Sequence, residues 1–376
     1  MAALVTEAQL RDATCIVGVG NTRYGNFPET DDYGLGAQAL KNALADAGLT
    51  VDDLDGLIVG RIRSYETFSE MVGFNRQRYN VQLNSAGRFS AMSVMNAAMA
   101  LATGQASCIA LVYGNNGKSV RDSYGGAPGL YAPWGFTSPG ARHALMARRH
   151  MDLYGTTSEH FGHVSKAFRQ HASMNDNAVR RDPFTIEEHQ ASRFVAEPLR
   201  LLDYCQVNDG AVALIMTTPD RAKDLKKPPA YISGWARADD YSRASIYPED
   251  LWYAPLQDVA SRVYDNAGVK REDIDGLMIY DNFSPTVLFS LEGMGFCGRG
   301  EGGPFAAEGQ LELGKGRWPT NTSGGHLSES YMQGWALIAE AVRQVRGECG
   351  ARQIPDCKAV QYICATTICS SIIIRR

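Results

Sequence analysis

Residues 43–60 read ALADAGLTVDDLDGLIVG, and residues 263–280 read VYDNAGVKREDIDGLMIY. The two stretches align without a gap at an offset of 220 residues, from position 43 to position 263. Each copy starts in a helix that ends at a glycine, continues through a short acidic turn and enters an apolar strand. The matching residues are Ala47-Gly48 with Ala267-Gly268, Asp53 with Asp273, and Asp55-Gly56-Leu57 with Asp275-Gly276-Leu277. A period this long indicates a duplicated domain rather than a solenoid.

Strands and amphipathic helices alternate in both halves, which predicts layered α/β structure. We expect an N-terminal half over 1–225 and a C-terminal half over 226–376, packed together. Helices are predicted at 34–47, 87–104, 255–267 and 328–346. Strands are predicted at 15–19, 58–60, 109–113, 230–234, 277–280 and 360–364, with a further buried strand around Ile372-Ile373-Ile374.

A long insertion occupies roughly residues 115–200 of the first half. It contains a Gly-Gly-Ala-Pro segment at 125–128, the aromatic residues Tyr131, Trp134 and Phe136, and a helical stretch rich in histidine and arginine from Ala141. Such an insertion can cover an active site or contact a neighbouring subunit, and it can equally be a solvated excursion.

Composition argues against several classes of protein. The net charge of −4 gives no electrostatic footprint for nucleic acid. No apolar run approaches the roughly 20 residues that span a bilayer, and no basic and then apolar N-terminal segment predicts export. The eight cysteines form no CxxC pair, and the seven histidines show no ligand spacing such as HExxH. We therefore expect buried free thiols in a cytoplasmic protein that binds no metal.

Gly18-Val19-Gly20 follows a predicted strand and invites a dinucleotide-binding interpretation. Arg23 stands where the third glycine of that fingerprint belongs, so we interpret the two glycines as a tight strand exit. The chain contains neither the phosphate-loop pattern GxxxxGKS/T nor the GxSxG nucleophile elbow.

Several collinear segments, which together cover nearly the whole chain, resemble the thiolase superfamily. The closest branch is that of the sterol-carrier and lipid-transfer-protein-type thiolases. The resemblance implies a duplicated thiolase fold, an α/β architecture with five αβαβα layers. The segments that carry it are Pro198-Leu199, Leu201–Cys205, Asn208–Leu214, the helix at 143–155 with Gly155-Thr156-Thr157, Tyr280-Asp281-Asn282-Phe283, and Asn321-Thr322-Ser323-Gly324-Gly325.

The same alignment lacks the catalytic residues of thiolases. Ser85 stands where those enzymes carry a nucleophilic cysteine at a helix N-terminus. Tyr331 replaces the histidine that activates this cysteine, and Tyr280 replaces the oxyanion-hole asparagine or histidine. The second thiolase cysteine is retained as Cys364, but its Cys-x-Gly motif becomes Cys364-Ala365-Thr366.

These replacements change the chemistry that the site can perform. A serine hydroxyl attacks a thioester only when an adjacent base takes its proton. The resemblance puts a tyrosine at the position of that base, and a phenol titrates at about 10. We therefore interpret Ser85 as a helix N-cap or a small pocket-lining residue rather than a nucleophile.

Two tyrosines in one pocket suit the retro-aldol cleavage of a β-hydroxyacyl-CoA. In that reaction the β-hydroxyl loses its proton, the Cα–Cβ bond breaks, and a ketone or aldehyde and a thioester enolate form. The enolate needs hydrogen-bond donors at oxygen and then a proton at carbon, and a phenol supplies both. We predict that one of Tyr280 and Tyr331 activates the hydroxyl while the other stabilises or reprotonates the enolate. The simpler interpretation of each is a core aromatic residue with its hydroxyl satisfied.

Three further residues are candidate supporting groups. His326 follows the Gly-Gly loop, and it is either a proton relay or a structural histidine. Cys364 ends a predicted strand, and it is a proton donor, a relic of the thiolase site or a buried inert thiol. Asp281 directly follows Tyr280.

Within the superfamily, the tyrosines resemble those of the aldolases of bacterial steroid side-chain degradation. Those enzymes cleave a 17-hydroxy steroid acyl-CoA to a 17-ketosteroid and a short acyl-CoA, often propionyl-CoA, together with a small partner that has a zinc ribbon and an OB-fold. The resemblance implies a homodimer and, with such a partner, a heterotetramer. It implies no cofactor, with coenzyme A present only in the substrate thioester and zinc only in the partner.

Two other functions are open at this point. The chain could be a thiolase or acyltransferase that acts on a 3-ketoacyl-CoA through Ser85 or Cys364 and forms a trappable acyl-enzyme. It could also be a non-catalytic subunit that binds a lipid or an acyl-CoA. Replacement of the tyrosines discriminates between an enzyme and a binding protein, because a binding protein has no turnover to lose.

Overall fold

A computed structural model of the chain describes residues 6–83, 89–122, 132–136, 138–239 and 249–376. Within these residues a nine-stranded sheet has the order β3-β2-β4-β7-β1-β8-β11-β10-β9, and β5 pairs with β6 in a separate hairpin. The strands are β1 (Cys15–Asn21), β2 (Gly56–Gly60), β3 (Tyr79–Leu83), β4 (Cys108–Asn115), β5 (Phe194–Ala196), β6 (Leu199–Arg200), β7 (Gly210–Thr217), β8 (Ala230–Asp239), β9 (Gly276–Ile279), β10 (Ala359–Cys364) and β11 (Ile368–Arg375).

The large sheet consists of two half-sheets that meet where β1 pairs with β8. In the N-terminal half, β2 is parallel to β3 and β4, and β7 runs antiparallel to β4 and β1. In the C-terminal half, β9 is parallel to β10, and β11 runs antiparallel to β10 and β8. The junction itself consists of two residue pairs, Cys15 with Tyr231 and Ile16 with Ala230. Outward from the junction, the order β1, β7, β4, β2 in the N-terminal half therefore matches the order β8, β11, β10, β9 in the C-terminal half.

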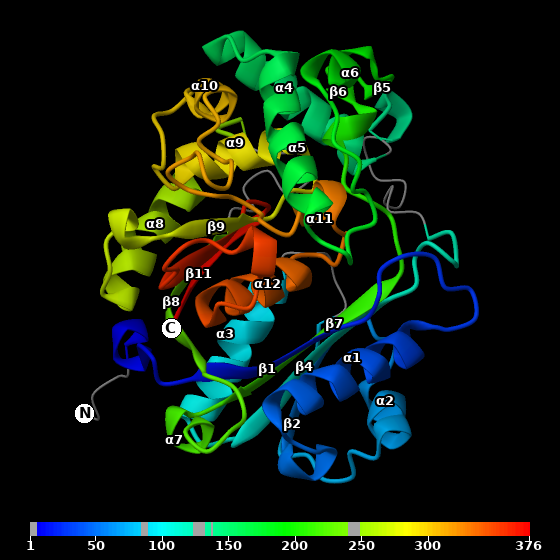
Figure 1. Cartoon of the computed structure of the whole chain (residues 1–376), viewed down its shortest axis with the longest axis vertical. Coiled ribbons are helices and arrows are strands. Elements are labelled where there is room, and N and C mark those ends of the chain that lie inside the picture. The colour runs from blue at the N-terminus through cyan, green and yellow to red at the C-terminus, as the bar shows by residue number, and fades with distance from the viewer. Residues whose placement is uncertain (1–5, 84–88, 123–131, 137, 240–248) are drawn as a thin grey trace.

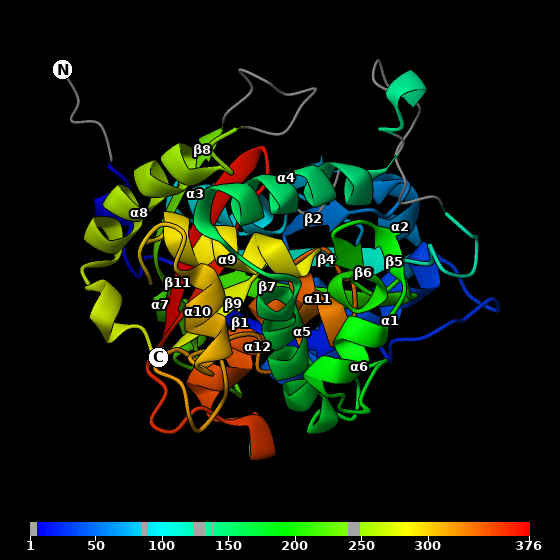
Figure 2. The same ribbon diagram turned by 90° about the horizontal axis from the view of Figure 1, so that it is seen from above.

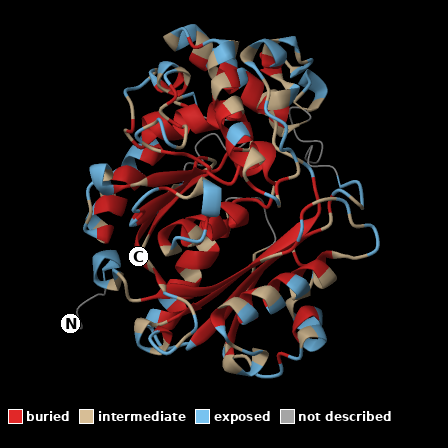
Figure 3. Cartoon of the chain, viewed as in Figure 1, coloured by how far each residue is buried: buried red, intermediate tan, exposed pale blue. Residues whose placement is uncertain are grey.

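Two buried helices, α3 (Phe89–Ala102) and α12 (Trp335–Arg346), lie between the half-sheets and contact strands of both (Figures 1 and 3). On the outer faces, α1 (Asp32–Ala47) covers the N-terminal half-sheet and α8 (Tyr253–Ala267) covers the C-terminal one. The order of layers is helix, sheet, helix, sheet, helix, which confirms the predicted αβαβα architecture.

The described part of the insertion packs over the C-terminal half. Its helix α4 packs against α9, α5 packs against α9, α10 and α11, and α6 packs against α5 (Figure 2). Phe161, Val164 and Phe168 of α5 are buried in this contact. The interpretation of this part as a solvated excursion is therefore wrong. The remaining α-helices of the described residues are α2 (Tyr65–Val72), α4 (Pro139–Tyr154), α5 (Ser158–Ser173), α6 (Ile186–Ala191), α7 (Pro219–Ala222), α9 (Ser284–Gly293), α10 (Gly302–Ala307) and α11 (Gly325–Ser328).

The two copies of the repeated sequence have the same local structure. α1 ends at Gly48 and α8 ends at Gly268, with left-handed φ angles of 74° and 65°. The carboxylate of Asp55 accepts hydrogen bonds from backbone N–H groups at the start of β4, and that of Asp275 does so at the start of β10. In each half one acid therefore joins the turn before one strand to the beginning of its neighbour.

The glycines of β1 allow α1 to approach the sheet closely. A Cβ atom on Gly18 would lie 2.4 Å from the backbone oxygen of Ala43, and one on Gly20 would lie 2.2 Å from that of Ala39. Our expectation that the strand ends in a tight turn at these glycines is wrong, because β1 continues to Asn21.

The predicted helix at 328–346 is interrupted. Gln333 and Gly334 adopt left-handed φ angles of 48° and 90°, so α12 begins only at Trp335. The N–H of Gly334 donates to the side chain of His326 rather than to a preceding helical carbonyl. This turn separates α11 from α12 and carries Tyr331.

All eight cysteines are free, as predicted, and six are buried. Cys205 and Cys297 correct the expectation of full burial, because both are partly exposed. Within the described ranges no helix is long and apolar enough to cross a membrane.

Candidate active site

Tyr280 and Tyr331 lie in direct hydrogen-bond contact. Tyr280 directly follows β9, and Tyr331 lies in the turn between α11 and α12. Their hydroxyl oxygens are 2.8 Å apart, and their rings are inclined at 66°. Tyr280 is 2% exposed, whereas Tyr331 is only partly buried. The structure therefore brings the two predicted catalytic residues together, with Tyr331 on the more accessible side.

The environment of the pair keeps Tyr280 protonated at neutral pH. Burial raises the pKa of Tyr280 well above its ordinary value of 10, and the neighbouring hydroxyl of Tyr331 raises it further. A phenol is both a donor and an acceptor of hydrogen bonds. When one hydroxyl donates to the other, the O–H of the acceptor is left to point at a third group, which is the arrangement that a proton-transfer reaction needs.

His326 lies against both tyrosine rings, with ring centroids 4.7 Å from Tyr280 and 5.2 Å from Tyr331. Its Nε2 accepts the backbone N–H of Gly334 at 2.9 Å, and burial lowers its pKa to about 3. Its Nδ1 lies 3.3 Å from a carboxylate oxygen of Asp281 without forming a hydrogen bond. Neither ring nitrogen is bonded to a tyrosine hydroxyl in the part of the chain that the structure describes. These contacts favour the structural interpretation of His326 over the proton relay.

Asp281 fastens α11 beside the tyrosine pair. Its buried carboxylate accepts the backbone N–H groups of His326 at 2.9 Å and Leu327 at 3.1 Å. A Cβ atom on Gly325 would lie 2.3 Å from the same carboxylate, so only glycine fits there. Burial raises the pKa of Asp281 well above 3.8, and the backbone donors offset part of this effect. The carboxylate therefore fixes the position of α11.

Cys364 ends β10 and is fully buried, with its sulfur 3.9 Å from the hydroxyl of Thr366. Two residues earlier, the hydroxyl of Tyr362 lies 2.9 Å from that of Ser90 in α3. Our sequence analysis missed Tyr362 and Ser90, although strand alternation puts Tyr362 on the same face as Cys364. Ser85 lies outside the described residues.

Two further contacts that we did not predict hold the turn that carries Tyr331. The side-chain oxygen of Asn208 accepts the backbone N–H of Tyr331 at 2.9 Å. A Cβ atom on Gly334 would lie 2.2 Å from the hydroxyl of Tyr362 and 2.5 Å from that of Ser90. The Asn-Asp-Gly segment at 208–210, noted for its resemblance to thiolases, was the available signal for Asn208.

The site therefore lies where the parallel strands β9 and β10 end, beside α3 and the turn between α11 and α12 (Figure 1). Ligand sites of α/β proteins form at such carboxyl ends of strands. Two hydrogen-bonded phenols lie there, at the positions that the resemblance assigns to the thiolase base and oxyanion-hole residue. Fold and site together define a thiolase-fold protein with a pair of hydrogen-bonded tyrosines at this edge of the sheet.

Comparison with known proteins agrees with this class. Residues 239–372 match the model of the thiolase C-terminal domain-like family. Human mitochondrial 3-ketoacyl-CoA thiolase superposes with a TM-score of 0.73 over 97% of this chain and 99% of that chain, at 16% identity, which shows the shared fold.

Closer relatives define the family. The chain is 38% identical over 358 residues to the 17-hydroxy-3-oxo-4-pregnene-20-carboxyl-CoA lyase of Mycobacterium tuberculosis, over 90% of this chain and 92% of that protein. It is 38% identical over 361 residues to the steroid side-chain-cleaving aldolase of Thermomonospora curvata, over 90% and 91%. The structure of an Ltp2-ChsH2(DUF35) aldolase superposes with a TM-score of 0.89 at 36% identity, over 97% and 98%. The chain therefore belongs to the steroid side-chain-cleaving aldolases of the thiolase superfamily, and it is a carbon–carbon lyase.

Proposed function

We propose that this lyase cleaves the CoA ester of a 17-hydroxy steroid side chain by a retro-aldol reaction, releasing a 17-ketosteroid and a short acyl-CoA such as propionyl-CoA. Identity of 38% over nearly the full length of two steroid-specific relatives supports this substrate class. The observation that carries the mechanism is the 2.8 Å contact between the hydroxyls of Tyr280 and Tyr331.

In the proposed reaction the two phenols act as one proton-transfer unit. One phenol accepts the proton of the β-hydroxyl while its own proton passes to its partner, and the partner delivers a proton to the α-carbon of the enolate. The carbonyl of the ketone forms as the Cα–Cβ bond breaks, and a Cα–H bond replaces the original O–H bond. No proton is gained or lost overall. Because burial makes a lasting phenolate at Tyr280 unfavourable, a concerted transfer through the pair is the lower-energy route.

We propose that the reaction requires no cofactor, because proton transfers and hydrogen bonds suffice. Coenzyme A takes part as a portion of the substrate, and zinc belongs to a partner subunit. A small OB-fold and zinc-ribbon partner is supported by the Ltp2-ChsH2(DUF35) composition of the superposed aldolase. A homodimer is supported by β3, whose outer edge pairs with no other described strand. We propose that the partner makes this homodimer a heterotetramer. We place the complex in the cytoplasm.

The decisive experiment measures cleavage of a β-hydroxyacyl-CoA with a tertiary hydroxyl by the complex of the chain with its partner. Products are followed by mass spectrometry without added free CoA, and Tyr280→Phe and Tyr331→Phe are compared with Tyr264→Phe. Tyr264 is a suitable control because its hydroxyl bonds Gln361 at 3.1 Å, in the outer layer of the fold. We expect each site variant to lower kcat by about 10²-fold or more, and the control to match wild type. The double variant should be no worse than either single one.

Other outcomes would lead to a different function. Cleavage of a 3-ketoacyl-CoA that requires free CoA would indicate thiolysis and make Ser85 or Cys364 the nucleophile. Tight binding of the ester without turnover in wild type would indicate a binding subunit. Full activity of both tyrosine variants would contradict the mechanism, even if the products were those expected.

A further inference from the structure

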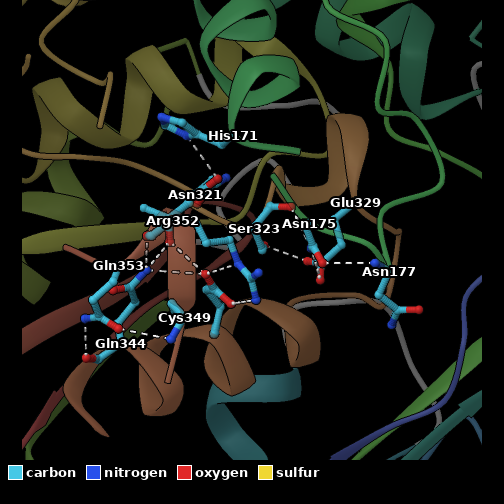
Figure 4. Close-up of polar contacts among 12 residues, drawn as sticks. His171, Asn175, Asn177, Asn321, Ser323, Glu329, Gln344, Cys349, Arg352 and Gln353 are labelled. Atoms are coloured by element: carbon cyan, nitrogen blue, oxygen red, sulfur yellow. Dashed lines mark hydrogen bonds and ion pairs between the residues drawn. The ribbon is translucent and has the colours of Figure 1, made fainter. Parts of the chain in front are cut away.

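The turn that carries Tyr331 also carries a buried acid, Glu329, which is 4% exposed. One carboxyl oxygen of Glu329 accepts the hydroxyl of Ser323 at 2.6 Å, and the other accepts the side-chain amide of Asn175 at 3.1 Å (Figure 4). Both donors are neutral. Among the described residues, no ion pair includes Glu329.

Arg352, a cation whose charge acts on Glu329, is engaged by a second acid. Arg352 donates to both carboxylate oxygens of Glu340, at 3.0 and 3.2 Å, and the hydroxyl of Thr322 donates to Glu340 at 2.9 Å. Arg352 therefore forms its ion pair with Glu340 and acts on Glu329 only through its charge. Burial and next the charge of Glu340 raise the pKa of Glu329 to about 7, while the bond from Ser323 and the charge of Arg352 offset part of the effect.

These contacts tie down the loop that leads to Tyr331. Ser323 lies before α11 and Glu329 directly after it, so their hydrogen bond closes the loop on itself. The same amide of Asn175 that bonds Glu329 also donates to the backbone oxygen of Ser323, at 2.9 Å, and joins the loop to the end of α5. Tyr331 follows Glu329 by two residues. A change in the contacts of Glu329 therefore acts on the tyrosine pair through a short segment.

Glu329 also lines an open cavity of about 610 Å³, most of whose other lining residues have polar side chains. Its walls come from β1 and α1 of the N-terminal half, the end of α5, and α12. Four charged residues line the same cavity as Glu329: Arg23, Asp176, Arg343 and Arg352. Glu340 and the hydroxyl of Tyr24 also interact electrostatically with Glu329.

We propose that Glu329 is a positioning residue for the tyrosine pair: its carboxyl holds the loop that carries Tyr331 through Ser323 and Asn175, beside a cavity that is open to water. The inference rests on the proposed function of that pair. Ser323 and Asn175 bond the carboxylate more strongly than the acid, but burial and the charge of Glu340 outweigh them. Loss of the proton therefore leaves an unfavourable buried charge, which displacement of the loop toward the water of the cavity relieves.

We expect the free energy of unfolding to fall as the pH rises, because of Glu329. Folding raises the pKa of Glu329 above its ordinary value of 4.5, so the folded state binds this proton more tightly than the unfolded state does. The stability associated with the protonated acid is fully present below about pH 4.5. It falls as the pH rises to about 7, and it levels off above that value.

The first test requires no substrate. Wild type and Glu329→Gln are compared at pH 5 and pH 8 by denaturant unfolding and by hydrogen exchange of peptides that cover 321–334. Glutamine keeps an acceptor for Asn175, and its amide can donate to the hydroxyl oxygen of Ser323, which then accepts instead of donating. It cannot lose a proton. We expect the two proteins to match at pH 5, and wild type to be less stable and less protected at pH 8. Asp176→Asn, which removes an exposed acid from the same cavity, should behave as wild type. Equal responses to pH in wild type and Glu329→Gln would overturn the proposal.

The second test uses the complex with its partner. We expect kcat of wild type to decline as the pH rises through about 7, and kcat of Glu329→Gln to stay level, with KM unchanged in both. Turnover with identical pH profiles would overturn the positioning role. Absence of turnover in wild type, together with the expected difference in stability, would overturn the proposed function. It would not affect the conclusion that Glu329 holds the loop through Ser323 and Asn175. Should Glu329→Gln fail to fold, Ser323→Ala replaces it: loss of the hydroxyl donor should move the midpoint of the wild-type stability change to higher pH, and an unmoved midpoint would overturn the proposal.

Discussion

A neutral imidazole supports the turn that carries Tyr331, and its protonation provides a test at the scale of one residue. Burial lowers the pKa of His326 from 6.5 to about 3. The folded state therefore disfavours the proton, and the contribution of His326 to stability is present above pH 6.5 and lost as the pH falls toward about 3. We expect the free energy of unfolding of wild type to decrease, relative to that of His326→Gln, by up to about 1.4 kcal/mol per pH unit in this window.

Denaturant unfolding between pH 4 and pH 7 measures this difference. The comparison between wild type and variant isolates His326 from Glu329, whose effect on stability has the opposite sign. His163→Gln is the matched control, because His163 is a helical histidine outside the site and only partly buried. A difference between wild type and His326→Gln that does not change with pH would contradict the assignment of a neutral, buried ring.

At the scale of elements, the repeated Asp-Gly-Leu turn joins neighbouring strands in both halves. Asp55 accepts the backbone N–H groups at the start of β4 at 2.8 and 2.9 Å, and Asp275 accepts those at the start of β10 at 2.7 and 2.9 Å. Removal of either carboxylate leaves two donors without their partner, and such a loss costs about 1–3 kcal/mol. We therefore expect Asp55→Ala and Asp275→Ala to lower the free energy of unfolding by similar amounts.

The repeat also provides the controls. Asp52 and Glu272 occupy equivalent, exposed positions three residues before these acids. Their alanine variants should change the free energy of unfolding by less than about 0.5 kcal/mol. A large effect in one half only would show that the second copy has lost the role of its carboxylate.

The elements also show which features local sequence could predict. The ends of α1 and α8 and the positions of β2 and β9 agree with the prediction to within two residues, because a glycine C-cap and an apolar strand are local signals. The predicted start of the helix that corresponds to α12 was wrong. The turn before α12 depends on contacts of Gly334 with His326 and Tyr362, and the periodicity of the sequence does not encode these contacts.

The same limit applies to the site. Tyr280 and Tyr331 were found because they stand at positions where a resembling family carries catalytic groups. Glu329 offered no such signal: its burial depends on Asn175 from the insertion and on Glu340 from α12, which only the folded chain brings together.

At the scale of the whole molecule, the two halves share one core. Ala91 and Val94 of α3 and Leu337 and Val342 of α12 belong to a single buried cluster that includes inward residues of both half-sheets. Neither half covers this apolar face alone, and the strand junction between them consists of two residue pairs. The duplicated sequence therefore describes two structural repeats that depend on one another for stability.

This shared core predicts cooperative unfolding. We expect a single calorimetric transition whose enthalpy equals the van't Hoff enthalpy, although chains of this length commonly unfold in steps. Fragments 1–225 and 226–376, the halves expected from the sequence, should each lack a cooperative transition and a near-ultraviolet circular dichroism signal when expressed alone. Mixing them during refolding should restore both signals, because each fragment supplies the surface that the other must cover. Two separate transitions in the intact chain, or one fragment that folds alone, would show that a half possesses its own core and that α3 and α12 join two finished domains.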